Sequence, residues 1–151
     1  MSSEGKSSDE WKGVGNDFFK NGKYMEATDA YTKGIEAGET AVLYANRSFA
    51  NLKQELYGLA ISDADKAIEL DPEYVKASYR RGSANVALSH FKDAIADFRR
   101  VVKLQPRSKD ARAKLTRCKQ ELRRLAFEEA IAHEGTAPIW ETVDMGDMGA
   151  F

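Results

Sequence analysis

Five residues of this sequence combine side-chain types and spacings that could bind an anion. Lys76 and Arg80 lie four residues apart in the segment PEYVKASYRRGSANVAL, so on a helix both project from one face about a turn apart. Lys12 and Asn16 have the same spacing, and Asn46 lies between the two pairs in the sequence. Lysine and arginine supply charge-assisted donors, and asparagine amides supply directional donors without further charge. Together the five suit an anion, whereas each alone is explained more simply as a solvated helix residue.

The helices that must position these residues are predicted from the apolar spacing. Asp71 can cap a helix that begins at Pro72, because the missing N–H of proline is harmless in a first turn. An earlier helix begins at Asp9, carries apolar residues at helical spacing and ends at the turn pair Asn21-Gly22. A second helix follows it, so these two helices are expected to form an antiparallel hairpin.

The hairpin recurs twice along the chain at a nearly constant interval. Each repeat has a small residue followed twelve positions later by an alanine, which lets the two helices approach closely. These pairs are Gly15 with Ala27, Ser48 with Ala60, and Gly82 with Ala94. The spacing of Trp11, Gly15 and Phe18 also resembles the tetratricopeptide pattern. The sequence therefore predicts an all-α, right-handed α-solenoid of three tetratricopeptide (TPR) helix hairpins plus a carboxyl-terminal capping helix.

The domain boundaries follow from these repeats and from the composition at the two ends. The amino-terminal residues are small and polar and predict a disordered leader, whereas the carboxyl-terminal residues mix Gly, Pro, Met and acids and predict a linker or tail. A solenoid needs an end cap, because its last repeat would otherwise expose an apolar side. The predicted boundaries are 1–8 for the leader, 9–134 for the TPR domain (repeats at about 9–40, 41–73 and 74–107, capping helix at about 108–133) and 135–151 for the tail.

Two positions depart from the repeat pattern, and we expect them to loosen the packing. Gly34 stands where an alanine is expected, and Ala64 stands where the other repeats have Tyr31 and Phe98. A local change of this kind costs about 1–3 kcal/mol of stability.

Two charged segments lie outside the five-residue set. Asp63-Ala-Asp65 resembles the start of a calcium loop but lacks its glycine, so we expect a solvated helix face. Residues 107–124 hold eight basic side chains without interleaved aromatics, which favours a solvated capping helix, with phosphate binding or a membrane or domain contact as alternatives.

The composition and the motifs argue against catalysis. The two histidines, His90 and His133, have no partner at metal-ligand spacing, and H-E-x-x-H, G-x-S-x-G and P-loop patterns do not occur. Cys118 is the only cysteine, no apolar run approaches the length of a membrane span, and the formal net charge is −1. We therefore expect no enzyme activity from this chain, no cofactor and no metal, and neither a nucleic-acid nor a membrane partner. The expected location is cytoplasmic, with the nucleus as an alternative.

The five polar residues stand where TPR co-chaperones carry a two-carboxylate clamp. They lie in the segments KGVGN, ANRS and VKASYRR. This resemblance implies binding of the Glu-Glu-Val-Asp (EEVD) tail of heat-shock protein 90 or heat-shock protein 70, whose last aspartate presents a side-chain and a terminal carboxylate. The implied carboxylate-binding residues are Lys12, Asn16, Asn46, Lys76 and Arg80.

A broader resemblance covers residues 10–132. YGLAISDADKAIELDPEYVKASYRRGSANVAL and the capping segment KLTRCKQELRRLAFEEAIA are similar to the amino-terminal domain of the protein phosphatase 5 family. In that family the repeats recruit chaperones and cover the catalytic site, which implies a targeting and autoinhibitory domain whose second partner is its own phosphatase catalytic domain. The metal-site motifs of that catalytic domain do not occur in this chain. The alternative is a stand-alone TPR co-chaperone adaptor or scaffold with no linked enzyme.

Overall fold

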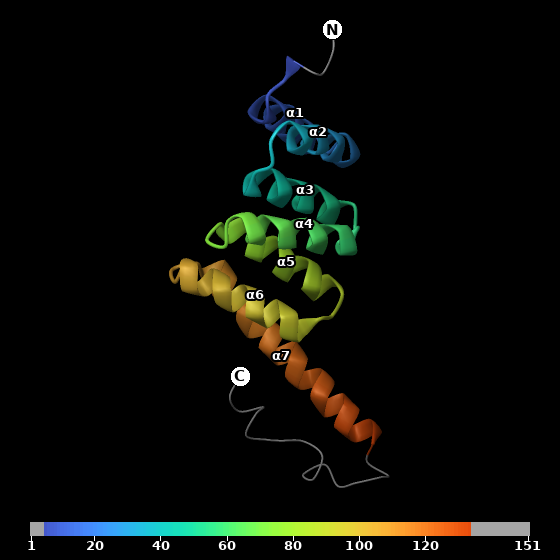
Figure 1. Ribbon diagram of the computed structural model, residues 1–151. Helices are drawn as coiled ribbons and strands as arrows, with labels where there is room; N and C mark the ends of the chain where they lie inside the picture. Colours follow the sequence, from blue (N-terminus) through green and yellow to red (C-terminus); the bar gives the residue numbers. More distant parts are fainter. Residues whose placement is uncertain (1–4, 134–151) are drawn as a thin grey trace.

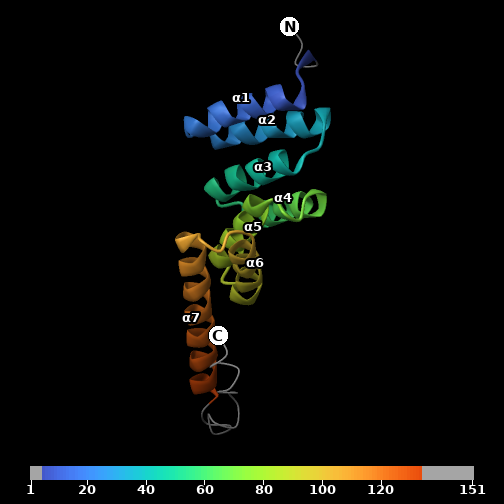
Figure 2. The same ribbon diagram turned by 90° about the vertical axis from the view of Figure 1, so that its left-hand side faces the viewer.

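The computed structural model describes residues 5–133, which form a stack of three antiparallel helix hairpins followed by one long helix (Figure 1). Within that range every regular element is an α-helix, so the predicted all-α solenoid of hairpins is confirmed. The last helix packs on the third hairpin and continues beyond the end of the stack (Figures 1 and 2). The helices are α1 (Ser8–Lys20), α2 (Tyr24–Ala37), α3 (Ala41–Lys53), α4 (Tyr57–Leu70), α5 (Val75–Ala87), α6 (Phe91–Leu104) and α7 (Lys109–Ala132).

Small residues of one helix face large residues of its partner inside the hairpins. A Cβ atom at Gly15 would lie 2.6 Å from Cδ1 of Tyr31, and one at Gly82 would lie 2.9 Å from Cζ of Phe98. In the middle hairpin both positions hold small residues, Ser48 where the other hairpins have glycine and Ala64 where they have Tyr31 and Phe98. Both residues are fully buried, and looser packing at Ala64 stays a prediction.

The expectation that Gly34 loosens the packing of its hairpin is wrong. A Cβ atom there would lie 2.9 Å from Cδ2 of Leu43 and 3.2 Å from Cβ of Trp11. These two larger side chains already fill the volume that an alanine methyl group would take, so glycine is the residue that fits.

Two predicted helix starts differ from the structure. The first helix begins at Ser8, and Ser7 and Glu10 form a reciprocal capping box, so the predicted leader ends too late. The helix expected from Pro72 begins at Val75 instead, because Oδ1 of Asp71 accepts from the backbone N–H of Glu73 and closes a turn. Residues 1–4 of the predicted leader and the whole predicted tail, 135–151, lie outside the described residues.

A buried ion pair joins the two helices of the second hairpin and corrects the expectation of a solvated Asp63. Asp63 is 6% exposed, and its carboxylate oxygens lie 2.6 Å from Nη2 and 2.9 Å from Nε of Arg47. Nδ2 of Asn51 donates to the same carboxylate at 2.9 Å. Only Asp65 of this segment is exposed, and it still pairs with Arg81.

The same arrangement recurs one repeat later, in the third hairpin. Arg81 and Asn85 both donate to the buried carboxylate of Asp97, and Arg81 also donates to Asp65 of the preceding repeat at 2.9 Å. Arg81 therefore ties together α4, α5 and α6.

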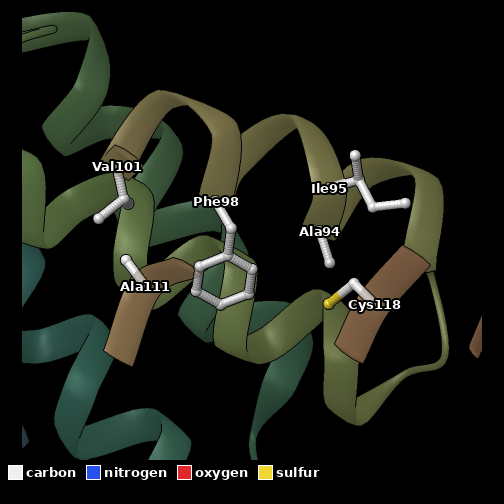
Figure 3. Close-up of a cluster of buried hydrophobic side chains, with 6 residues drawn as sticks. All are labelled: Ala94, Ile95, Phe98, Val101, Ala111 and Cys118. Atoms are coloured by element: carbon white, nitrogen blue, oxygen red, sulfur yellow. The ribbon is translucent and has the colours of Figure 1, made fainter. Parts of the chain in front are cut away.

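The end of the stack is closed by an apolar cluster between α6 and α7 (Figure 3). Ala111 and Cys118 of α7 lie against Phe98 and Val101 of α6, and all four are buried. Cys118 is therefore a core residue, and its burial raises the pKa of its thiol. None of the helices within residues 5–133 is long and apolar enough to cross a membrane.

Candidate anion-binding surface

The first helices of the three hairpins, α1, α3 and α5, carry the five residues singled out by the sequence. Nδ2 of Asn46 on α3 donates to Oδ1 of Asn16 on α1 at 3.3 Å. The guanidinium carbon of Arg80 on α5 lies 3.6 Å from the centre of the Phe49 ring, which belongs to the next turn of α3 after Asn46. Contacts thus run from α1 through α3 to α5, which places polar groups of all three repeats on one surface.

The Asn16 amide is held from inside its own hairpin. The Tyr31 hydroxyl on α2 donates to Oδ1 of Asn16 at 2.6 Å, and the Tyr31 side chain is only 2% exposed. Burial raises the pKa of Tyr31 to about 12, so this hydroxyl remains protonated and able to donate at neutral pH. Oδ1 of Asn16 therefore accepts from two donors, Tyr31 and Asn46, and the donor end of the amide is turned away from them.

Arg80 is half-buried on an aromatic platform. Its guanidinium lies over Phe49, which in turn packs against Phe19 of α1 with 4.7 Å between the ring centres. Loss of water around Arg80 lowers its pKa, although an arginine with a lowered pKa is still a cation at neutral pH. A guanidinium that stacks by its face keeps its N–H donors in the plane of its edge, where they can meet a carboxylate.

The two lysines extend the surface from α1 and α5. Lys12 is half-buried, and its ammonium lies 3.5 Å from the exposed Asp9 carboxylate, a pairing that is weak in water. Lys76 is exposed and lines, with Arg80, Tyr79 and other residues of the third repeat, a groove of about 350 Å³. Asn16 is thus hydrogen-bonded to Asn46, and Arg80 packs on Phe49 of the same helix as Asn46. Lys76 shares a groove with Arg80.

Sequence reasoning missed two contributors to this surface, Tyr31 and Phe49. Phe49 lies three residues after Asn46 on the same helix, which was a usable signal because residues three apart share a face. The position of Tyr31 in the repeat predicts only that its ring packs between helices, and nothing in the spacing reveals that its hydroxyl reaches Asn16.

The basic capping helix meets this surface near its start, where the Tyr79 hydroxyl donates to Asp110 and the Lys114 ammonium lies over the Tyr79 ring. Arg124 is paired with Glu121 at 2.8 Å and with Glu128 at 2.7 Å, all within α7. Ion pairs of this exposed kind agree with the expected solvated face.

A stack of helix hairpins, each packed on its neighbour, defines a helical-repeat protein. The family model described as tetratricopeptide repeat matches residues 50–109. The first TPR domain of Spaghetti (RPAP3), solved bound to the HSP90 peptide SRMEEVD, is 39% identical and has a TM-score of 0.75, with 76% of this chain and 94% of that domain covered. The chain belongs to the tetratricopeptide repeat family.

Two further relatives extend the comparison. The second TPR domain of the human RPAP3 protein, solved in complex with the HSP70 peptide SGPTIEEVD, is 44% identical with a TM-score of 0.69, over 72% of this chain and 92% of that domain. Human serine/threonine-protein phosphatase 5 is 41% identical over 145 residues, which is 95% of this chain and 29% of the phosphatase. The chain thus spans about 30% of the length of the curated relatives that it matches first.

Proposed function

We propose that this chain binds the carboxyl-terminal EEVD tail of heat-shock protein 90 or heat-shock protein 70 through a two-carboxylate clamp. The proposal is supported by two contacts that link α1 and α5 to the same helix, α3: Asn16 with Asn46, and Arg80 with Phe49. Similar TPR domains with EEVD peptides bound support the choice of ligand. Such a tail ends in an aspartate with two carboxylates, each of which accepts hydrogen bonds from cationic and amide donors.

Each donor has a distinct part in this binding. The guanidinium edge of Arg80 pairs with one carboxylate, and the Nδ2 groups of Asn16 and Asn46 donate to the other, while Lys12 and Lys76 add charge at the rim. Affinity is expected to be of order micromolar, because a flexible peptide loses conformational freedom when it docks.

The clamp is tested by replacing Arg80 and measuring binding of the peptide SRMEEVD by calorimetry. Because the Arg80 guanidinium is half-buried, Arg80→Ala is expected to cost about 2–5 kcal/mol, which weakens binding about 30-fold or more. Arg99→Ala on the exposed side of α6 removes the same charge outside the proposed surface and serves as the matched control. Equal affinities for the two variants would contradict the clamp.

We further propose that the chain is the targeting and autoinhibitory domain of a metal-dependent serine/threonine protein phosphatase that acts in the cytoplasm and nucleus. Its 41% identity to human phosphatase 5 over 95% of this chain favours this interpretation over a stand-alone adaptor or scaffold. In the whole protein, removal of residues 1–133 should raise phosphatase activity toward a small phosphate ester. Lack of a catalytic domain in the gene would support the adaptor instead.

A further inference from the structure

The donor end of the clamp amide at Asn16 is oriented by a buried hydroxyl from the other helix of its hairpin. Tyr31 donates to Oδ1 of Asn16 at 2.6 Å, which is shorter than the 3.3 Å between that atom and Nδ2 of Asn46. The Tyr31 ring fits against Gly15, where any Cβ atom would collide with it. The ring, and hence the hydroxyl, is fixed by packing.

An asparagine amide has one oxygen that accepts and one nitrogen that donates. If the Asn16 amide turned over, its Nδ2 would face Nδ2 of Asn46, donor against donor, and that hydrogen bond would be lost. The Tyr31 hydroxyl would also have to change from donor to acceptor. The observed arrangement therefore selects the rotamer in which Nδ2 points away from Tyr31. A carboxylate can only accept hydrogen bonds, so that is the orientation in which Asn16 can bind it.

We propose that Tyr31 is a positioning residue for peptide binding, whose hydroxyl holds Oδ1 of Asn16 so that Nδ2 donates to a carboxylate of the ligand. This inference rests on the proposed function and adds a residue that does not itself touch the peptide. It predicts that affinity depends on a hydroxyl group that is shielded from solvent.

The other repeats provide an internal comparison. The third repeat has Phe98 at the position of Tyr31 and Ser83 at the position of Asn16. The hydroxyl thus occurs in the repeat that carries the asparagine and is missing where a serine replaces it. Phe98 packs against Gly82 as Tyr31 packs against Gly15, so a phenylalanine at position 31 should keep the hairpin intact.

The test uses Tyr31→Phe, which removes only the hydroxyl, and calorimetric titration with SRMEEVD. Loss of one oriented hydrogen-bond donor should weaken binding about three- to tenfold, from the net contribution of a single hydrogen bond. Tyr44→Phe is the matched control, because the buried Tyr44 hydroxyl donates to Oε1 of Glu39 at 2.6 Å rather than to a clamp residue. The control should bind as the wild type does.

A double-mutant cycle separates positioning from a general loss of stability. In an Asn16→Ala background, Tyr31→Phe should have no further effect on affinity, because the amide that it orients is gone. An equal loss in both backgrounds would overturn the inference, as would a Tyr31→Phe variant that binds as tightly as the wild type. If the wild type itself does not bind SRMEEVD, the proposed function fails and the inference fails with it.

A second measurement needs no substitution. In ¹H–¹⁵N spectra of the wild-type chain, the Nδ2 protons of Asn16 should shift downfield when SRMEEVD is added, since they gain a carboxylate acceptor. Protons that stay in place while the peptide binds would overturn the inference.

Discussion

At the scale of single residues, the aromatic platform under Arg80 separates this surface from a set of independent cations. The Arg80 guanidinium lies 3.6 Å from the Phe49 ring centre, so the side chain is held by its face and loses little freedom when its edge binds a ligand. The platform continues to Phe19 of the first repeat. Arg80 is therefore positioned by α1 and α3 as well as by its own helix.

Replacement of Phe49 by leucine should weaken peptide binding without abolishing it. The cation–π contact contributes about 0.5–2 kcal/mol, so we expect an affinity about two- to thirtyfold lower in calorimetric titrations. Phe127→Leu, at an exposed position of α7, is the control that should leave affinity unchanged. A Phe49→Leu variant with wild-type affinity would show that the ring does not position Arg80.

The two aspartates of the segment Asp63-Ala-Asp65 should respond to mutation very differently. Asp63→Ala leaves the half-buried Arg47 without its partner and should lower the free energy of unfolding by about 3–5 kcal/mol. Asp65→Ala breaks an ion pair whose carboxylate is 55% exposed and should cost less than about 1 kcal/mol. Urea unfolding of both variants measures the difference, and equal losses would contradict the structural distinction.

At the scale of elements, each hairpin turn places one residue in the left-handed region. Gly22 has φ of 75°, and Glu55 and Ser89, at corresponding positions of the other hairpins, both have φ of 59°. Only the first turn uses glycine, the residue for which this conformation carries no steric cost.

Alanine substitutions of two glycines should therefore have opposite signs. Gly22→Ala should destabilise the chain by about 1–2 kcal/mol, because alanine resists a positive φ although the space around its Cβ is open. Gly13→Ala, also with open space but inside α1, should stabilise it by about 0.5–1 kcal/mol. Thermal unfolding of the two variants gives the comparison, and changes of the same sign would refute this account of the turn.

The helix hairpins could be predicted from the sequence, whereas one helix boundary could not. The small residue and the alanine of each repeat predicted the hairpins correctly, because close helix packing demands those sizes at fixed spacing. The start of α5 was missed because Asp71 acts on Glu73 in a turn instead of capping a helix. Proline in a first turn is a preference, and the competing side-chain hydrogen bond prevailed over it.

The buried ion pairs were missed for a different reason. The exposure of Asp63 was predicted from the residues next to it in the sequence. Its partner Arg47 lies on α3, the preceding helix. The signal was present, since Arg47, Asn51 and Asp63 all recur one repeat later as Arg81, Asn85 and Asp97. The repeat spacing of these charged and amide residues, read in the same way as that of the small residues, predicts the two buried ion pairs.

At the scale of the whole molecule, the stack brings together side chains that are far apart in the sequence. Asn16 belongs to the first repeat and Arg80 to the third, yet each contacts α3, through Asn46 and Phe49 respectively. The ion pairs of Arg47 and Arg81 join α3 to α4, and α5 to α4 and α6. The sequence alone predicts which five residues could bind an anion. The contacts that orient these residues depend on side-chain geometry, which their spacing does not determine.

The most direct measurement of the central claim is calorimetric titration of the 151-residue chain with SRMEEVD, beside the same peptide with an amidated carboxyl terminus. The amide removes one of the two carboxylates of the last aspartate and leaves the rest of the peptide unchanged. The clamp predicts that the free acid binds and that the amide binds at least about tenfold more weakly, since a charge-assisted contact is lost. Equal affinity for the two peptides, or no binding of either by the folded chain, would contradict it.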